Sequence, residues 1–551
     1  MSTVTTTPAA VQMLNVQIDG VWLQFPKGTR VIEACTQAGK FIPRYCYHAK
    51  LSSPGNCRMC LIEMGMPKMG PDRKPLMGAD GKPEIAWIPR PQISCAQDVA
   101  EGMGIRTDSK MAQECRQGVM EFLLINHPLD CPICDQAGEC RLQEFSVEYG
   151  NASSRFLEQK VKKPKNVELG PRVTLDAERC VLCSRCIRFM KEVAKDDVLG
   201  FVDRGSFSTI ACHPDRLLES NYSLNTVDIC PVGALTSSDF RFKMRVWFLK
   251  ETKTIDVNDG LGANITIGSR QEKIYRITPR ENNDVNACWL PDSHRLNFKY
   301  LSREDRLTSP LVNSLPLEWT RALSAAAAAL KGAQPGSVAM VASARMTNEE
   351  LFLAKRLASV LGVEKMDVVP RRGEPDGIMI VADRNPNTNG AKLLGVAGDK
   401  PGVRLPGIVQ GVRDGSIKVV IALAEDLTEI GLKAEDLAKL ETLIAMNILP
   451  NATTGAATVV LPSSGWAEKR GSMINIKGRL QRLNRAVQAP GLARDDWEIL
   501  RDLIQAVSGT NGLAMIEDVF QQMAASTPAL AGLNLSKIGD LGLPLQIQAT
   551  A

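Results

Sequence analysis

The chain has 551 residues, 23% of them charged, and a formal net charge of only +5. This length indicates several domains, and the small, evenly mixed charge gives no support to nucleic-acid binding. No apolar run approaches the length of a membrane-spanning helix. Fifteen cysteines in so long a chain, many at metal-ligand spacings, argue against a disulfide framework and favour a reducing compartment.

The first predicted domain follows residues 1–12, which we interpret as a disordered lead-in without signal- or transit-peptide features. Residues 14–18 and 21–25 alternate apolar and polar side chains around an Asp-Gly turn, which predicts a β-hairpin. A helix is expected over 31–38. Strand, hairpin, strand and helix before a cysteine-bearing loop resemble plant-type [2Fe–2S] ferredoxins, so we expect a β-grasp domain over 13–108.

The first ligand set lies in this domain and has the spacing C-x10-C-x2-C-x34-C. Its members are Cys46, Cys57, Cys60 and Cys95. Plant-type ferredoxins have C-x4-C-x2-C and a distant fourth cysteine, so the first gap is longer here while the number of thiolates is unchanged. The Pro- and Gly-rich segment 65–91 is expected to be a surface excursion between the third and fourth ligands. The set predicts one [2Fe–2S] cluster.

The second ligand set follows a predicted helix over 111–125, which ends because proline disfavours helical geometry in the residue before it. Its pattern is H-x3-C-x2-C-x5-C, formed by His127, Cys131, Cys134 and Cys140. One histidine and three cysteines can also bind zinc, and spacing alone leaves this open. Because the other two ligand sets have iron–sulfur spacings, we favour a [4Fe–4S] cluster with one imidazole ligand. It would lie in a domain of residues 109–150. Replacing a thiolate by neutral imidazole should raise the reduction potential.

The third ligand set has the most specific spacing. It consists of a C-x2-C-x2-C loop and a Cys-Pro that follows the last cysteine of the loop after forty-three intervening residues. Its members are Cys180, Cys183, Cys186 and Cys230. Met190 stands where a two-cluster ferredoxin would have another cysteine, so the set predicts one [4Fe–4S] cluster, in a ferredoxin-like domain of residues 165–245. A zinc knuckle would use two separated pairs instead. Candidates for tuning the potential lie beside the ligands, namely Ser184, Arg185 and Arg188, although solvent-facing charge is the alternative for the arginines.

In this order the three sets, followed by Cys-Pro-Val-Gly-Ala-Leu, resemble the large iron–sulfur subunit of bacterial respiratory complex I, NADH:quinone oxidoreductase. The stretch from His127 to Cys140 is the most specific match. The resemblance implies one [2Fe–2S] and two [4Fe–4S] clusters that relay electrons from the flavin of a partner subunit toward quinone. The implied partners are the flavin- and NADH-binding subunit and the other iron–sulfur subunits of the peripheral arm. They would hold the chain on the cytoplasmic side of the bacterial inner membrane.

Four cysteines lie outside the three sets: Cys35, Cys115, Cys212 and Cys288. The first two fall in predicted helices and are expected to be buried free thiols. Cys212 stands beside His213, but two adjacent residues make a poor metal site without further ligands. Some bacterial relatives hold an additional [4Fe–4S] cluster on four cysteines after the third set. Because this chain offers only Cys288 there, that cluster is expected to be absent.

The second half carries no cysteine or histidine after His294. Short strand-like runs separated by Asp-Gly and Pro turns predict a small strand-rich domain over 252–306, which we expect to be of the molybdopterin oxidoreductase type. Helices then alternate with apolar strands, which predicts a doubly wound α/β domain over 307–551. Buried parallel strands are expected at 338–341, 377–381 and 417–423. Thr347 to Glu350 form a capping box that opens a helix.

Residues 459–479 resemble the molybdopterin oxidoreductase family, and in the large iron–sulfur subunit of complex I this domain is a degenerate relative without the cofactor. No cysteine or selenocysteine is available to ligate molybdenum, although serine or aspartate stays open. We therefore expect a structural domain without molybdopterin. Gly260-Leu-Gly262 lacks the third glycine of a dinucleotide fingerprint, and no P-loop occurs. The sequence predicts no site for NADH, flavin, quinone or ATP, and no catalytic side chain.

Two alternative functions remain open on the sequence. One alternative is the electron-input subunit of an NAD-coupled hydrogenase or formate dehydrogenase, which has the same three ligand sets in its N-terminal part. A hydrogenase with its own active site would need further cysteine motifs after Cys230, and a formate dehydrogenase would be expected to keep a pterin ligand. The other alternative is a non-redox zinc scaffold.

Overall fold

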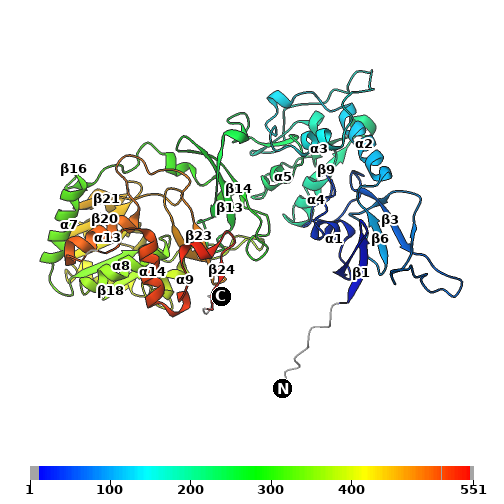
Figure 1. Ribbon diagram of the computed structural model, residues 1–551. Coiled ribbons are helices and arrows are strands. Elements are labelled where there is room, and N and C mark those ends of the chain that lie inside the picture. Colours follow the sequence, from blue (N-terminus) through cyan, green and yellow to red (C-terminus); the bar gives the residue numbers. More distant parts are fainter. Residues whose placement is uncertain (1–11, 511, 547–551) are drawn as a thin grey trace. The chain divides into compact units, whose positions relative to one another are not determined.

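The computed structural model describes residues 12–510 and 512–546 (Figure 1). The chain divides into two compact units, Met1–Val246 and Trp247–Ala551. Of the predicted lead-in, only Gln12 belongs to the described residues. No helix within the described ranges is both long and apolar enough to cross a membrane.

The first unit begins with the predicted hairpin, β1 (Met13–Ile18) and β2 (Val21–Pro26), which pair antiparallel. Asp19 and Gly20 form the turn with positive φ angles of 46° and 85°, as a tight hairpin requires. The sheet order is β2-β1-β6-β3-β4, and β6 runs parallel to β1. Its remaining strands are β3 (Leu61–Pro67), β4 (Ile85–Trp87), β5 (Gln92–Ile93) and β6 (Met103–Arg106). The helix α1 (Val31–Gln37) buries Val31, Ile32 and Cys35 in the core of this sheet.

Helical and ferredoxin-like segments complete the first unit. The predicted helix after the sheet is α2 (Lys110–Ile125), capped by the Ser109 hydroxyl, which accepts from the Ala112 N–H. A 3-10 turn, η1 (Cys131–Ile133), and α3 (Arg141–Tyr149) follow it. The last part has two small sheets and two helices: β7 (Val167–Glu168), β8 (Val173–Leu175), β11 (Leu235–Ser237), β9 (Leu199–Val202), β10 (Thr209–Cys212), α4 (Arg185–Glu192) and α5 (Asn225–Asp228).

The second unit opens with an antiparallel sheet of three strands, as the strand-like runs predict. Its elements are β12 (Lys250–Ile255), β13 (Asn264–Arg270), β14 (Lys273–Pro279) and the short helix α6 (Asp292–Leu296). The core between them includes Ile265, Ile267, Ile277 and Leu290, and it continues onto Trp466 and Met473 farther along the chain. The small strand-rich segment therefore shares its core with the following domain.

A sheet of order β16-β15-β21-β20-β19-β17-β18 forms the centre of the second unit. The strands β17 to β21 are parallel, and the order reverses between β17 and β19. The strands are β15 (Leu311–Val312), β16 (Leu315–Pro316), β17 (Val338–Ala342), β18 (Lys365–Val368), β19 (Val419–Leu423), β20 (Thr442–Asn447) and β21 (Val459–Pro462). A separate sheet holds β22 (Gly471–Ile474), β23 (Arg479–Leu483) and β24 (Leu543–Pro544).

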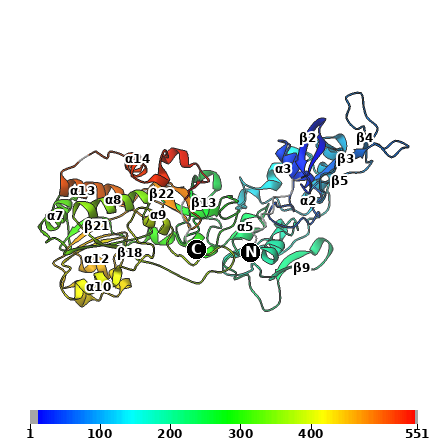
Figure 2. The same ribbon diagram turned by 90° about the horizontal axis from the view of Figure 1, so that it is seen from below.

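Helices cover both faces of the parallel sheet (Figure 2). They are α7 (Trp319–Gly332), α8 (Asn348–Val360), α9 (Thr388–Leu393), α10 (Leu405–Arg413), α11 (Ala434–Leu437), α12 (Ala452–Ala456), α13 (Asp496–Ser508) and α14 (Ile516–Ser526). Val419, Ile421 and Leu423 of β19 pack with α7, α8 and α13, whereas Val420 and Ala422 pack with α10. This alternation gives each face its own core, as in a doubly wound fold.

The structure confirms the capping box, in which Thr347 and Glu350 bond each other's backbone N–H at the start of α8. It contradicts the strand predicted at 377–381, which is a partly exposed loop. One oxygen of Asp376 accepts the N–H groups of Ile378, Met379 and Ile380, and Gly377 has a φ of +71°. The apolar run was misleading because this local turn satisfies backbone groups that a strand would pair across a sheet.

Candidate metal centres

The structure brings the first ligand set together. Cys46, Cys60 and Cys95 are at most 1% exposed, and Cys57 is half-buried. The thiol of Cys57 contacts that of Cys46, while Cys95 contacts both Cys46 and Cys60. Cys95, the member farthest along the chain, thus lies with the other three. Nearby hydroxyls support the ligand backbone: Ser94 Oγ donates to the Cys60 carbonyl at 2.8 Å, and Ser53 Oγ donates to the Cys95 carbonyl at 2.7 Å.

The long gap between Cys46 and Cys57 has a structural role that the sequence did not reveal. Residues of this loop bind α4, the helix that carries Cys186. Arg185 donates to the Tyr47 carbonyl at 2.6 Å, and Arg188 donates to the carbonyls of Cys46 and Ser52. The extra residues are therefore the part of the first domain that docks on the ferredoxin-like domain.

The third ligand set lines one cavity. Cys180, Cys183, Cys186 and Cys230 line one partly open pocket, whose volume is about 10 Å³. Leu182 and Ser184 have φ angles of 53° and 62°, so the loop between the first three cysteines curls tightly, and the Leu182 N–H lies 3.4 Å from the Cys180 sulfur. Further backbone N–H groups point at the other sulfurs, those of Arg185, Ile187, Val232, Ala234 and Leu235.

The chemistry of this cavity fits a group that carries positive charge. Burial raises the pKa of all four thiols, to about 12 for Cys180 and Cys183. Four buried thiolates would be costly unless metal ions balance them, and the N–H donors favour the thiolate form. Arg185 also donates to the Ile229 carbonyl at 3.1 Å, next to Cys230. The arginine is thus not solvent-facing charge but a link between two ligand loops.

The second ligand set lies around η1. His127 follows α2, Cys131 begins η1, and Cys140 is the N-cap residue of α3. Burial, followed by the charge of Arg179, lowers the pKa of His127 to about 4, so its imidazole is neutral at pH 7 and can offer a lone pair. Cys131 is exposed, Cys134 is buried and Cys140 is half-buried.

Contacts join the second set to the third. An ideal Cβ on Gly233 would lie 2.3 Å from the Cys134 sulfur, so only glycine fits at that position of the Cys-Pro-Val-Gly segment. Arg245 donates to the Cys134 carbonyl at 2.6 Å, and the Arg141 N–H donates to the Pro231 carbonyl at 3.1 Å. Gly233 is a site residue that the sequence left unassigned, although it stands inside the recognised motif.

A buried tyrosine lies between the first and second sets. Tyr45 is fully buried, its ring packs against Phe145 at 5.4 Å between centroids, and its hydroxyl contacts the Met120 sulfur at 3.3 Å. Burial is the main cause of its raised pKa, and the charges of Cys140 and Cys57 add to it. Tyr45 therefore faces one cysteine of each set.

The four cysteines outside the sets differ in their surroundings. Cys35 is fully buried in the first core, as predicted, and burial raises its pKa to about 12. Cys115 is half-buried rather than buried, because α2 presents it at the edge of its packed face. Cys212 donates to the Leu169 carbonyl at 3.3 Å, and Cys288 is half-buried.

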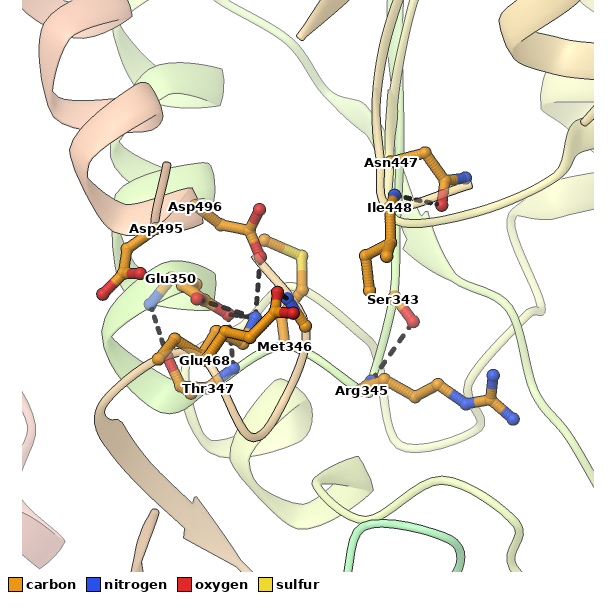
Figure 3. Close-up of polar contacts among 12 residues, drawn as sticks. Ser343, Arg345, Met346, Thr347, Glu350, Asn447, Ile448, Glu468, Asp495 and Asp496 are labelled. Carbon is orange, nitrogen blue, oxygen red and sulfur yellow. Dashed lines mark hydrogen bonds and ion pairs between the residues drawn. The ribbon is translucent and has the colours of Figure 1, made fainter. Parts of the chain in front are cut away.

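Buried polar groups lie at the carboxyl ends of the parallel strands, where α/β folds bind ligands, and some of them pair with one another (Figure 3). Ser343 follows β17, and Asn447 ends β20. The Lys469 ammonium lies 2.9 Å from Glu350 of α8 and 2.7 Å from Asp496 of α13, and all three side chains are buried. Burial alone would lower the pKa of Lys469, but the charges of Asp496 and Glu350 raise it above its usual value.

Family models match five segments of the chain. The 2Fe-2S iron-sulfur cluster binding domain matches residues 11–110, and the NADH-ubiquinone oxidoreductase-G iron-sulfur binding region matches 116–155. The ferredoxin-like domain of NADH-quinone oxidoreductase subunit 3 matches 170–236. The NDSU1/NuoG-like 4Fe-4S domain matches 249–299, and molybdopterin oxidoreductase matches 369–506. The predicted succession of a 2Fe-2S domain, 4Fe-4S segments and a molybdopterin oxidoreductase-like domain is confirmed. The match at 249–299 is described as a 4Fe-4S domain, whereas we expected a strand-rich domain of molybdopterin oxidoreductase type there. Each of the first three matches encloses one ligand set.

Curated relatives agree with these matches. The G subunit of the NADH-quinone oxidoreductase of Rickettsia felis is 40% identical over 360 residues, covering 65% of this chain and 50% of the relative. The mitochondrial NADH dehydrogenase [ubiquinone] iron-sulfur protein 1 of Solanum tuberosum is 41% identical over 360 residues, covering 64% and 46%. The chain thus spans about half the length of the curated relatives it matches. An NAD+-reducing [NiFe]-hydrogenase crystal structure matches 42% of this chain and 91% of its own, at 25% identity and a TM-score of 0.35, too low to relate the folds.

Proposed function

Because the chain belongs to the family of the G subunits of NADH-quinone oxidoreductases, we propose that it is an electron-transfer subunit of such a complex. Electrons would reach it from the flavin of a partner subunit and leave it toward quinone. When bound, an iron–sulfur cluster supplies the ability to accept and release single electrons. The chain's own residues hold the clusters, exclude water from them and set their potentials.

The observation that carries the proposal is the contiguity of the three ligand sets within one compact unit. Arg185 joins the loop after Cys46 to the residue before Cys230. Gly233 contacts the sulfur of Cys134, and Tyr45 lies between the first and second sets. Three adjoining sites are what a relay of electrons needs, whereas isolated structural sites need no such adjacency.

Our ligand assignment follows the three sets. One [2Fe–2S] cluster would be held by Cys46, Cys57, Cys60 and Cys95. Two [4Fe–4S] clusters would be held by His127, Cys131, Cys134 and Cys140, and by Cys180, Cys183, Cys186 and Cys230. Hydrogen bonds to sulfur raise the potential of such sites, and so does the neutral imidazole of His127. The corresponding domain limits are 13–108, 109–150 and 165–245, followed by 252–306 and 307–551.

The geometry does not favour a zinc scaffold. A zinc ion holds its sulfur ligands at about 2.3 Å, which places them roughly 4 Å from one another. Within the described residues, the group of three or more metal-ligand side chains that converges within 4.8 Å is Asp256, Asp259 and His294, not a cysteine set. This argument applies to the second and third sets, because neighbouring thiols of the first set contact one another.

The proposed partners follow from the same family. The protein would bind the flavin- and NADH-binding subunit and the other iron–sulfur subunits of a peripheral arm. These partners would place it on the cytoplasmic side of a bacterial inner membrane. We assign no site for NADH, flavin, quinone or molybdopterin to the chain itself.

Iron and sulfide analysis with low-temperature EPR, on anaerobically reconstituted full-length protein, tests the proposal. We expect about ten irons per chain, with one binuclear and two tetranuclear signals. A His127→Cys variant should keep its iron while the potential of one tetranuclear signal falls, because a charged thiolate replaces neutral imidazole. Cys115→Ser, a half-buried thiol outside the sets, is the matched control and should leave every signal unchanged.

Three outcomes would contradict parts of the proposal. Zinc with little iron would overturn the electron-transfer function. A His127→Cys variant with both tetranuclear potentials unchanged would remove His127 from the ligand set. About fourteen irons would mean that a further cluster exists despite the single cysteine after the third set.

A further inference from the structure

A second kind of metal-ligand group lies outside the cysteine sets. One ligand atom from each of Asp256, Asp259 and His294 lies within 4.8 Å of the others. Asp256 follows β12, Asp259 stands in the turn before β13, and His294 lies on α6. Three segments of the small strand-rich domain thus converge on one point.

The two carboxylates are buried, His294 is half-buried, and hydrogen bonds hold all three side chains in place. Asp256 is 2% exposed and Asp259 is 1% exposed. One oxygen of Asp259 accepts the Leu261 N–H at 3.0 Å, and the other accepts the Val381 N–H at 3.0 Å. His294 Nδ1 lies 2.7 Å from Asp256 Oδ2. Metal-ligating carboxylates are oriented by hydrogen bonds of this kind.

Charge balance favours a cation at this point. Two buried carboxylates face one imidazole, so a protonated His294 would neutralise one of them, and Arg384 is a further cation whose charge reaches His294. An uncompensated buried carboxylate is costly. A divalent cation with two carboxylates and a neutral imidazole has no net charge, and it would replace the proton between His294 and Asp256.

The metal-ligand side chains of this segment supply oxygen and nitrogen rather than thiolate. The family model that matches residues 249–299 is described as a 4Fe-4S domain. This chain has Cys288 as its single cysteine in that range, so four thiolates cannot be supplied. The oxygen and nitrogen donors occur within the same range. Carboxylate with imidazole suits manganese, zinc or ferrous iron rather than a thiolate-bound cluster.

We propose that Asp256, Asp259 and His294 bind one divalent cation of the manganese–zinc class. Water would complete its coordination, because the chain supplies three ligands. The Val381 N–H bond of Asp259 extends the site to the loop at 376–381 of the α/β domain, so the ion would fasten the small sheet to that domain. The site is separate from the proposed electron relay.

Binding of Mn²⁺ to the full-length protein with its iron–sulfur clusters reconstituted tests this site. Mn²⁺ is the probe because thiolates discriminate against it, and free Mn²⁺ can be read from its room-temperature EPR signal. We expect one Mn²⁺ per chain, displaced by Zn²⁺. His294→Gln and Asp256→Asn keep the side-chain volume and should each weaken Mn²⁺ binding by ~10-fold or more.

Asp305→Asn, which changes an exposed carboxylate paired with Arg303 in the same unit, is the matched control and should bind Mn²⁺ as the parent does. Circular dichroism and iron content show whether each variant is folded, and the iron count reports the relay independently. A parent protein that binds no Mn²⁺ would overturn the proposal. Equal binding by the parent and by both folded site variants would overturn it too.

Discussion

Replacing Gly233 by alanine would place a methyl group where the Cys134 sulfur lies. The added Cβ would be 2.3 Å from that sulfur and 3.1 Å from Gln136 Cβ. Ordinary contacts are about 3.5–4.0 Å, so the two atoms must separate by roughly 1.2–1.7 Å. Overpacking of this size costs about 1–3 kcal/mol where a core resists it. Here the irregular segment around η1 gives way more easily than the loop after Cys230, whose backbone N–H groups face the third cavity.

We therefore expect Gly233→Ala to lose iron from the second site and to keep it at the third. Iron analysis should fall from about ten to about six per chain, with one tetranuclear EPR signal lost. Gly200→Ala is the matched control, because a Cβ there meets nothing within 4 Å. Full iron content in the Gly233 variant would refute the steric reasoning. Loss of the EPR signal of the third site instead would show that the loop after Cys230 moves rather than the segment around η1.

Two further predictions concern the buried charges of the second unit. Lys469→Met leaves Glu350 and Asp496 without their cation and should destabilise this unit by about 3–5 kcal/mol in urea unfolding, whereas adding Glu350→Gln and Asp496→Asn should recover most of the loss. Burial raises the pKa of Glu349 from 4.5 to about 7, so the folded protein favours the neutral acid. The stability that this group contributes is therefore lost as the pH rises from about 4.5 through 7. Relative to Glu349→Gln, the parent should lose about 2.5 kcal/mol between pH 5 and pH 8, and a constant difference would contradict the assignment.

Local features of the fold were predictable because they depend on neighbouring residues. The first hairpin, α2 and the capping box of α8 follow from alternation, helical period and a hydroxyl–carboxylate spacing, and the structure has all of them. The strand expected at 377–381 failed because a single carboxylate, Asp376, satisfies three backbone N–H groups there. Apolar composition does not reveal such a turn.

For the candidate sites too, local features could be predicted from the sequence and contacts between distant segments could not. Spacing along the chain located the three sets, and the structure gathers even the distant Cys95 with its partners. The contacts between sets could not be predicted. The fit of Gly233 against Cys134, and the bonds from Arg185 to Tyr47 and Ile229, join residues far apart in sequence, and no local pattern encodes them.

The arginines of α4 link the loop of the third ligand set to the loop of the first set. The tight turn at Ser184 begins α4, so this helix takes its position from the loop that presents Cys180, Cys183 and Cys186. Arg185 and Arg188 of that helix in turn hold the backbone around Cys46. A substitution that displaces the loop of Cys180, Cys183 and Cys186 should therefore also displace the backbone around Cys46. The loop that carries Cys46 is thus held by a segment more than a hundred residues later in the chain.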